Sequence, residues 1–197
     1  MARDMTPVLK RCRALCIEPA YMGLDKKSKR NVSAGRKPSE YALQLKEKQK
    51  AKFIYGVLEK PFRNNFAKAQ KLKYGTTGEN LMILLELRLD NVVFRMGYAR
   101  TRKEARQIVG HKHVLVNGKC VNIPSYTVKP GDKIEIKEKV KGYQRYKDVL
   151  ETTEGRLIPD WLEADHETLT GTVKEIPTRE QIDVPVNEVL IVELYSK

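Results

Sequence analysis

"TRKEARQIVGHKHVLVNGKCV", Thr101–Val121, is the stretch that decides the fold of this chain. Thr101 and Glu104 stand at the spacing of a capping box, so a helix is expected to begin at this threonine. The apolar face of the helix consists of Ala105, Ile108 and Val109. Asn117-Gly118 between two short apolar runs favours a hairpin with a type I′ turn. The stretch therefore predicts a short helix that leads directly into a tight hairpin.

The residues on either side extend this prediction to an α+β module. Before the stretch, "RLDNVVFRMG" (88–97) predicts a short helix with Asp90 as its N-cap. After it, "SYTVKPGDKIEIKE" (125–138) predicts a strand pair that turns at its Pro-Gly dipeptide. Gly110 is expected just past the end of the central helix. Residues 88–139 should thus form two helices packed on a small antiparallel sheet.

Further helices are expected outside the module. Ser39 can N-cap a helix, and Phe62 and Phe66 share one face of the next helix. Near the C-terminus, Asn187 is expected to cap a last helix. Residues 1–38 show no clear amphipathic period, and their basic, turn-prone sequence predicts an irregular arm.

The formal net charge of the 197 residues is +13, and it is unevenly distributed. Residues 1–75 hold 19 Lys or Arg against 6 Asp or Glu, and residues 76–140 hold 12 against 7. Residues 141–197 reverse the balance, with 7 against 12. A basic front and middle indicate a polyanionic partner, whereas the acidic end more readily faces protein.

Several classes of protein are not indicated. No apolar run approaches the roughly 18 residues of a membrane span, and no apolar segment of a secretory signal follows Met1. No phosphate-binding glycine loop, nucleophile elbow or His-Glu-x-x-His motif is present, so we expect no enzyme and no cofactor. Cys12 and Cys16 supply two of the four ligands of a zinc site, so no metal is expected. We expect a soluble cytoplasmic protein without a membrane partner.

The positive charge at the junction of helix and hairpin has a physical use. Two rigid elements form a ridge, and a row of cations on it can neutralise several phosphates of a folded RNA at once. Arg102 and Arg106 are four residues apart and are expected on one outward face. The alternative, a solvated helix face, stays open. For His111 and His113, contact with unpaired bases and a simple turn position both stay open.

These residues carry a resemblance to a known family. Residues 88–97, 101–109 and 113–134 resemble the S-four RNA-binding module. Together with "LKEKQKAKFIYGVLEKPFRN" (45–64) and "VNEVLIVELYSK" (186–197), they are similar to the bacterial small-subunit ribosomal protein S-four family from about residue 39 onward. Residues 1–38 match the family poorly.

The resemblance implies a fold and a domain organisation. The fold class is α+β, a helical domain plus a module of short helices on a small antiparallel sheet, preceded by a basic irregular arm. The expected domains are the arm at 1–38, a helical domain at 39–87 joined by the C-terminal segment 180–197, and an α+β domain at 88–179 with its RNA-binding module at 88–140.

The resemblance also implies a function. A structural protein of this family binds small-subunit (16S) ribosomal RNA directly, nucleates assembly of the body of the 30S subunit, and contributes to translational accuracy through contact with small-subunit protein five. Messenger RNA at the entry channel is a further implied partner, and the ribosome in the cytoplasm is the implied location. The alternative is an RNA-modifying enzyme or a synthetase appendage that uses the same module.

Candidate residues follow from the ridge and the resemblance. In the module, RNA contact is expected from Arg88, Arg95, Tyr98, Arg100, Thr101, Arg102, Lys103, Arg106, His111, Lys112, His113, Asn117 and Lys119. The arm and the helical domain are expected to add Arg3, Lys10, Arg11, Arg13, Arg36, Lys37, Lys46, Lys48, Lys50 and Arg63. The interface with protein five is expected on Asn187, Leu190, Glu193 and Tyr195.

Overall fold

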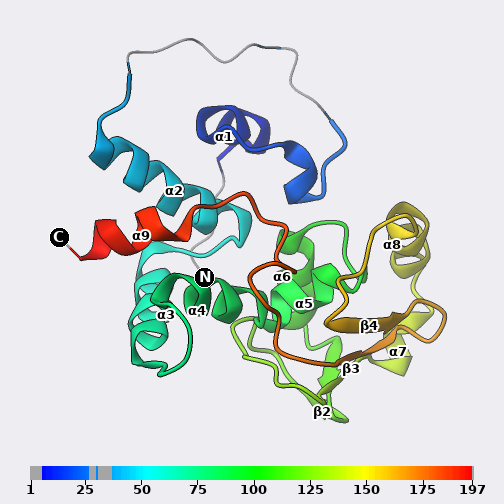
Figure 1. Cartoon of the computed structure of the whole chain (residues 1–197). Coiled ribbons are helices and arrows are strands. Elements are labelled where there is room, and N and C mark those ends of the chain that lie inside the picture. Colours follow the sequence, from blue (N-terminus) through cyan, green and yellow to red (C-terminus); the bar gives the residue numbers. More distant parts are fainter. Residues whose placement is uncertain (1–5, 27–29, 31–36, 197) are drawn as a thin grey trace. The chain divides into compact units, whose positions relative to one another are not determined.

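The computed structural model describes residues 6–26, 30 and 37–196, and it divides the chain into two compact units (Figure 1). Unit 1 comprises residues 1–82 and 183–197, and unit 2 comprises residues 83–182. Helices and an antiparallel sheet together confirm the α+β class. None of the described helices is both long and apolar enough to cross a membrane.

Unit 1 is helical in its described part. Its elements are α1 (Val8–Leu15), the 3-10 turn η1 (Pro19–Met22), α2 (Glu40–Ile54), α3 (Glu59–Lys71), most of α4 (Thr77–Glu86) and α9 (Glu188–Tyr195). α9 packs along α2, although the two helices are far apart in sequence (Figure 1). The ring of Tyr195 on α9 stacks on Phe66 of α3 at a centroid distance of 4.5 Å. The C-terminal helix is therefore part of the core of this unit.

The ends of these helices follow their sequence signals. The Ser39 hydroxyl accepts from the Ala42 N–H, which confirms the cap of α2. Asn187 Oδ1 accepts from the Val189 N–H, which confirms the cap of α9. A helix end leaves four unpaired N–H groups, and these side chains satisfy some of them.

The N-terminal arm contains more order than its sequence indicates. α1 and η1 lie within residues 1–38, and they bury Cys12, Leu15 and Met22. Cys16 ends α1 in the left-handed conformation at φ 54°. The prediction of an irregular arm was thus wrong for residues 8–22, because the few apolar residues there find a surface to pack on. Most of the basic stretch 26–38 lies outside the described residues.

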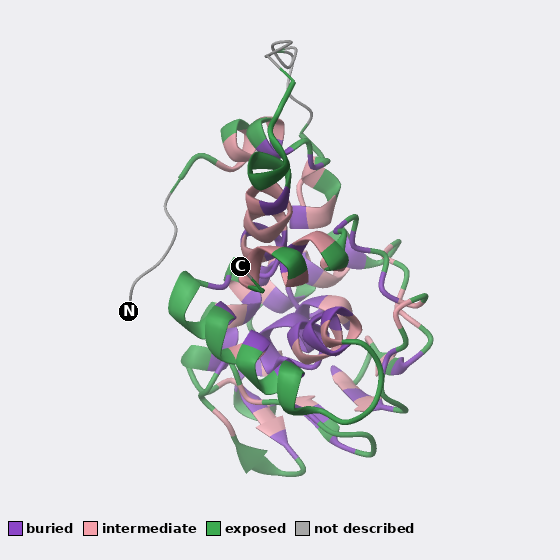
Figure 2. Ribbon diagram, turned by 60° about the vertical axis from the view of Figure 1, so that its left-hand side comes forward, coloured by how far each residue is buried: buried purple, intermediate pink, exposed green. Residues whose placement is uncertain are grey.

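Unit 2 packs helices on one antiparallel sheet of five strands. Its helices are α5 (Leu89–Arg95), α6 (Arg102–Gly110), α7 (Glu138–Lys141) and α8 (Gln144–Thr153). Its strands are β1 (Val114–Val116), β2 (Lys119–Cys120), β3 (Lys133–Ile136), β4 (Leu162–Asp165) and β5 (Thr170–Val173), in the order β2-β1-β3-β5-β4. Figure 2 shows β2 as exposed at the end of the sheet.

A single apolar core holds this unit together. The inward faces of α5 and α6 meet Val114, Ile134 and Ile136 of the sheet, and all three side chains are buried. Trp161, just before β4, is buried in the same core. Alternate residues of β3 are buried, because successive side chains of a strand point to opposite faces. The core thereby fixes α6 against the hairpin.

The hairpin that joins β1 to β2 turns at Asn117 and Gly118, with φ 50° and 76°. Two positive φ values in succession are those of a type I′ turn, so the prediction is confirmed. Asn117 also ties the turn to the next strand. Its Nδ2 donates to Asp132 Oδ1 at 2.8 Å, and its Oδ1 accepts from the Lys133 N–H at 2.9 Å.

Replacing Asn117 by alanine is expected to lower the free energy of unfolding by about 1–3 kcal/mol. Two hydrogen bonds are lost, one of them to a carboxylate, and alanine tolerates positive φ less well than asparagine. Denaturant titration of both proteins measures the change. Asn122→Ala, at an exposed position of the same region, is the control. Equal midpoints for wild type and Asn117→Ala would contradict this role of the side chain.

Three local predictions in the module were wrong. Asp90 does not cap α5, because its carboxylate is taken by Arg88. Residues 125–129 form no strand pair across the Pro-Gly turn; this segment instead bridges to Arg88, through Thr127. Gly110 lies inside the last turn of α6, and Lys112 takes the left-handed position at φ 63°.

Candidate RNA-binding surface

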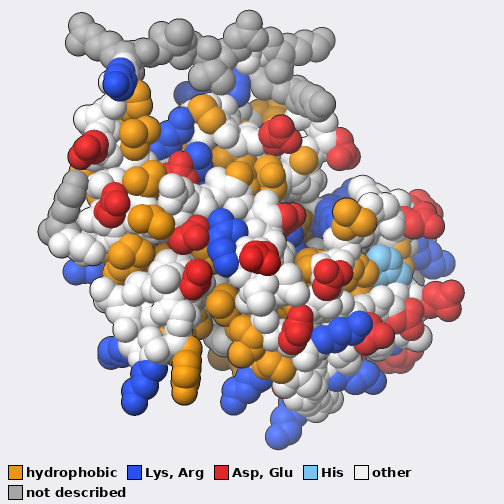
Figure 3. Space-filling model, viewed as in Figure 1, with side chains coloured by type: hydrophobic (Ala, Val, Ile, Leu, Met, Phe, Trp, Pro, Cys, Tyr) orange, Lys and Arg blue, Asp and Glu red, His pale blue; other side chains and the backbone are white. Residues whose placement is uncertain are grey.

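The outer surface of α6 and the hairpin carries the cations that the sequence placed there. Thr101 caps α6 by accepting from the Glu104 N–H at 3.2 Å. The exposed cations of this surface, which we call the ridge, are Arg100, Lys103, Lys112 and Lys119. His111 is also exposed beside them. In Figure 3, Lys and Arg side chains project where the β2 hairpin lies in Figure 1.

The acidic residue of α6 does not weaken the ridge. Glu104 accepts through Oε1 from Nε and Nη2 of Arg145 at 3.1 and 3.0 Å. Its Oε2 accepts from the Arg100 N–H at 2.8 Å. The carboxylate is therefore compensated within unit 2, so the ridge remains positive.

Arg102 does not belong to the ridge. Only 7% of the residue is exposed, its Nε donates to Asn91 Oδ1 at 2.7 Å, and its guanidinium lies 4.3 Å from the ring centre of Phe94. Arg106 is half-buried, with Nη1 3.6 Å from Asp90 Oδ2. The prediction that both arginines face outward was therefore wrong for Arg102. The buried face of α6 is wider than its apolar residues alone indicate, because it also includes Arg102.

Two more predicted RNA-binding arginines are engaged inside unit 2. Arg88 is buried and donates through Nε and Nη2 to both oxygens of Asp90, at 3.1 and 2.8 Å. Arg95 makes the same bidentate pair with Glu86, at 3.1 and 2.8 Å. Glu86 has an exposed fraction of 0%. These guanidinium groups pair with buried carboxylates, so they are not part of the candidate RNA-binding surface.

Tyr98 was expected to contact RNA, and its burial contradicts this expectation. Its exposed fraction is 0%, and its hydroxyl donates to the carbonyl oxygens of Thr170 and Asp165. Burial raises the pKa of Tyr98, so the hydroxyl stays protonated and available as a donor. Asn117 likewise uses its side chain within the fold. Both residues hold unit 2 in shape.

His113 sits at the back of the ridge rather than on it. Its Nδ1 lies 3.1 Å from the Tyr146 hydroxyl. Partial burial is the main cause that lowers the pKa of His113, and the charges of His111, Arg145 and Lys137 add to it. Burial raises the pKa of Tyr146 to about 12, so this hydroxyl can donate to the neutral imidazole. His113 is a packing contact between the hairpin and α8.

The free energy of unfolding should therefore fall as the pH drops through 6.5, the unperturbed pKa of histidine. Because the pKa of His113 is lowered in the fold, the unfolded chain binds more protons in this range. The stabilising contribution of neutral His113 is present above pH 6.5 and is lost as the pH falls below this value. Chemical denaturation over a pH series measures the slope, which His113→Gln should reduce more than His111→Gln, because the charge of His111 is a smaller cause of the shift than burial. Identical slopes for wild type and His113→Gln would rule out this assignment.

A second basic surface lies on α3 in unit 1. Besides the predicted Arg63, it exposes Lys60, Lys68 and Lys71. These three lysines are missing from the sequence-based set, although the chain from residue 60 to residue 78 contains no Asp or Glu, and that run was the available signal. Lys68 and Lys71 also stand in the last turn of the helix, where its dipole favours cations.

The lysines of α2 are engaged within unit 1. Lys48 and Lys52 both contact the Glu59 carboxylate, at 3.0 and 2.6 Å. Partial burial acts to raise the pKa of Glu59, but hydrogen bonds and charge from these lysines hold it at about 2. Lys50 pairs with Glu47 at 2.6 Å, and Lys46 Nζ donates to Cys16 Sγ at 3.1 Å. Lys46, Lys48 and Lys50 therefore have partners within unit 1.

The candidates in the arm divide into three groups. Lys10 and Lys37 are exposed. Arg11 and Arg13 are half-buried, and Arg11 Nη2 donates to Gln49 Oε1 at 3.1 Å. Arg3 and Arg36 lie outside the described residues.

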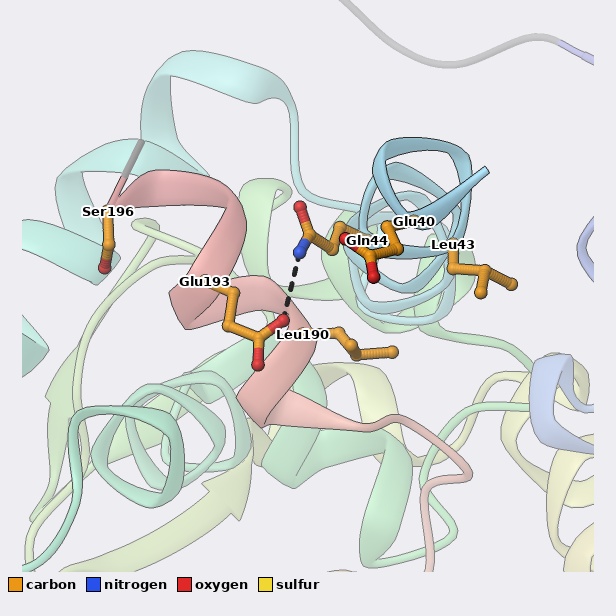
Figure 4. Close-up of a pocket in the computed structure, with 6 residues that line it drawn as sticks. All are labelled: Glu40, Leu43, Gln44, Leu190, Glu193 and Ser196. Carbon is orange, nitrogen blue, oxygen red and sulfur yellow. Dashed lines mark hydrogen bonds between the residues drawn. The ribbon is translucent and has the colours of Figure 1, made fainter. Parts of the chain in front are cut away.

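The candidate protein interface lies on α2 and α9. Leu190 and Glu193 line a pocket of about 520 Å³, together with Glu40, Leu43, Gln44 and Ser196 (Figure 4). Gln44 Nε2 donates to Glu193 Oε2 at 3.0 Å across it. Tyr195 instead turns onto Phe62 and Phe66, and Asn187 serves as the helix cap. Two of the four predicted interface residues, Leu190 and Glu193, thus line this pocket.

Among the described residues, no three His, Cys, Asp or Glu side chains gather as a metal site would require. Cys12 is buried, and burial raises its thiol pKa.

Two family models match consecutive parts of the chain. Residues 4–86 match the Ribosomal protein S4/S9 N-terminal domain, and residues 87–134 match the S4 domain. Relatives named Small ribosomal subunit protein uS4 are 81% identical in Lachnoclostridium phytofermentans, 73% in Lachnospira eligens and 68% in Agathobacter rectalis. Each alignment covers 100% of this chain and 100% of the relative. The chain belongs to the uS4 family of small ribosomal subunit proteins.

Membership of the uS4 family confirms the resemblance and the function class. The family is structural and not enzymatic, and its members are part of the ribosome in the cytoplasm. The alternative of an RNA-modifying enzyme or a synthetase appendage is thereby overturned, since uS4 relatives match the chain over its whole length. The match of residues 4–86 to the Ribosomal protein S4/S9 N-terminal domain also includes α1, in the part of the chain for which the sequence resemblance was poor.

Proposed function

We propose that this uS4 protein binds small-subunit ribosomal RNA through the ridge of unit 2 and the basic face of α3. The observation that carries the proposal is the set of exposed cations on a rigid frame: Arg100, Lys103, Lys112 and Lys119. Lysine and arginine at fixed positions neutralise phosphates and release counterions, and they lose little entropy when the frame is already ordered. Double-stranded parts of such an RNA are read by backbone and shape.

Binding of this kind would nucleate assembly of the body of the 30S subunit. A protein that binds one RNA fold lowers the free energy of that fold relative to its competitors. Later proteins then meet a preorganised site. A protein that is already ordered loses less entropy when it binds, and the core of unit 2 supplies that order.

Filter binding over a salt series tests the RNA proposal. The purified protein should prefer small-subunit ribosomal RNA to an unrelated double-stranded RNA of equal length. The logarithm of its affinity should fall with the logarithm of salt concentration by about 0.7–0.9 per phosphate contact. A salt-insensitive affinity, or equal affinity for both RNAs, would count against the proposal.

We further propose that the pocket of α2 and α9 contacts small-subunit protein five, and that this contact contributes to translational accuracy. Leu43 exposes apolar surface in the pocket that Glu40 and Glu193 also line (Figure 4). An apolar hollow with acidic residues suits a protein surface that offers an apolar side chain and a cation. Phosphate would be repelled from the same place.

A paired substitution tests this interface. Leu190→Ala with Glu193→Gln should weaken binding to protein five while RNA affinity stays within about twofold, because neither residue lies on the ridge. Val192→Ala, on the same helix but outside the pocket, is the control. Unchanged binding to protein five, with the double variant folded, would refute the interface.

The proposal for messenger RNA is narrower than the set of contacts that the family resemblance implies, which is Arg36, Lys37, Lys46, Lys48 and Lys50. Lys46, Lys48 and Lys50 hold partners within unit 1. Of the expected contacts at the entry channel, Lys37 is the exposed cation within the described residues. We therefore propose Lys37, two residues before the N-cap Ser39 of α2, as the contact to test first.

A further inference from the structure

The connection between α3 and α4 exposes an aromatic ring that no proposed contact uses. Tyr74 is 88% exposed, which is unusual for a side chain with so much apolar surface. Its neighbour Leu72 is 49% exposed. In Figure 3, hydrophobic side chains project beside Lys and Arg where this connection lies in Figure 1.

The backbone under Tyr74 is pinned. Its carbonyl oxygen accepts from Asn80 Nδ2 at 2.7 Å, and Asn80 is a buried residue of α4. The chain then turns at Gly75 with φ 73°. Thr76 and Glu79 close a reciprocal capping box, at 2.9 and 3.2 Å, that fixes the start of α4. The ring is thus presented by a short, tied loop, so ordering the loop on binding costs little.

The positive charge around Tyr74 favours an anionic partner. Lys71 and Lys73 flank it and are exposed, and residues 60–78 hold five Lys or Arg and no Asp or Glu. Glu79, the nearest acid in sequence, is engaged in the capping box. A cationic or purely apolar partner does not fit such a loop. A planar ring between cations suits a nucleotide, whose base stacks while its phosphates meet the ammonium groups.

We propose that Tyr74 is a base-stacking site for an unpaired nucleotide of RNA, with Lys71 and Lys73 on the adjacent phosphates. Bases inside a duplex are already stacked on their neighbours, so the ligand is a bulged, looped or terminal base. The inference rests on the RNA binding proposed above and adds a contact of a different kind, on unit 1. The ridge of unit 2 binds backbone charge, whereas this loop binds a base.

Filter binding with Tyr74→Ala and Tyr74→Phe tests the proposal. Tyr74→Ala should bind small-subunit ribosomal RNA about tenfold more weakly, which is the loss expected for one base stacked on an aromatic side chain. Tyr74→Phe should stay within about twofold, because phenylalanine keeps the ring face. The salt slope should not change in Tyr74→Ala, while Lys73→Gln should lower it by about 1. Tyr41→Ala, at an exposed tyrosine of α2, is the matched control and should bind as wild type does.

Ultraviolet cross-linking of the full-length protein to the same RNA provides direct evidence. A nucleotide adduct is expected on the peptide that contains Tyr74. If wild type shows no preference for small-subunit RNA, the proposed function fails. If wild type shows that preference and Tyr74→Ala binds equally well, only the stacking inference fails. An equal loss in Tyr74→Phe, or a Tyr74→Ala variant that keeps RNA affinity and loses a protein partner, would also overturn it.

Discussion

Arg95→Ala should lower the free energy of unfolding by about 3–5 kcal/mol, the cost of removing one partner of a buried ion pair. Arg95 donates through two nitrogens to Glu86, and the side chain of Glu86 is 1% exposed. Without the guanidinium, a negative charge remains in a nonpolar interior, where it interacts poorly with water. Asn91 Nδ2 donates to the same carboxylate at 2.6 Å, but one neutral donor does not replace a bidentate cation.

The measurement is denaturant unfolding of wild type, Arg95→Ala and Arg100→Ala. Arg100 is exposed on the ridge, so its loss should leave the midpoint nearly unchanged and weaken RNA binding instead. The double variant Glu86→Leu with Arg95→Met should regain much of the lost stability, because it removes both charges together. An Arg95→Ala protein of normal stability and weakened RNA affinity would return this arginine to the RNA-binding set.

Loss of three ridge cations at once should reduce RNA affinity by at least about 1,000-fold. In Lys103→Gln, Lys112→Gln and Lys119→Gln combined, each change removes one charge-assisted phosphate contact, worth about 1.5–3 kcal/mol. Their contributions should add approximately if the three contacts are independent. Lys112 occupies a left-handed position at φ 63°, and glutamine is no more strained there than lysine. The fold should therefore remain intact.

A charge-matched variant separates the ridge from total charge. Lys139, Lys147 and Lys174 are exposed elsewhere on unit 2, and replacing all three with glutamine changes the net charge by the same amount. This control should lose far less affinity, and its salt slope should stay close to that of wild type. The ridge variant should lower the salt slope by about 3, or about 1 for each lost phosphate contact. Equal losses in both variants would show that the RNA responds to net charge and not to the ridge.

The local signals of the sequence were dependable where one side chain satisfies a neighbouring backbone group. Ser39, Thr101 and Asn187 cap their helices as expected, and Asn117-Gly118 makes the expected turn. Each of these motifs is complete within about five residues. These caps and this turn form from neighbouring residues, so they do not depend on residues that are distant in the sequence.

The sequence failed where two residues compete for one partner or where the partner is distant. Asp90 has the right type and place for a cap, yet it pairs with Arg88. β4 and β5 were not expected. The chain between β3 and β4 contains α7 and α8, so no local turn signal indicates that β5 pairs with β3. The burial of Tyr98 depends on Thr170, 72 residues further along.

By itself, the sequence determined the fold class, the order of helix and hairpin in the module, and the charge that makes a polyanion the partner. Periodicity and capping act over one or two turns of helix, so a linear sequence records them. Only the tertiary structure decided which cations face solvent. Arg102 and Lys103 are neighbours of similar charge, but the buried Asn91 and the ring of Phe94 take the first and leave the second exposed. That selection needs groups brought together by the core, and it is the core that separates the arginines that hold the protein together from the cations that can reach RNA.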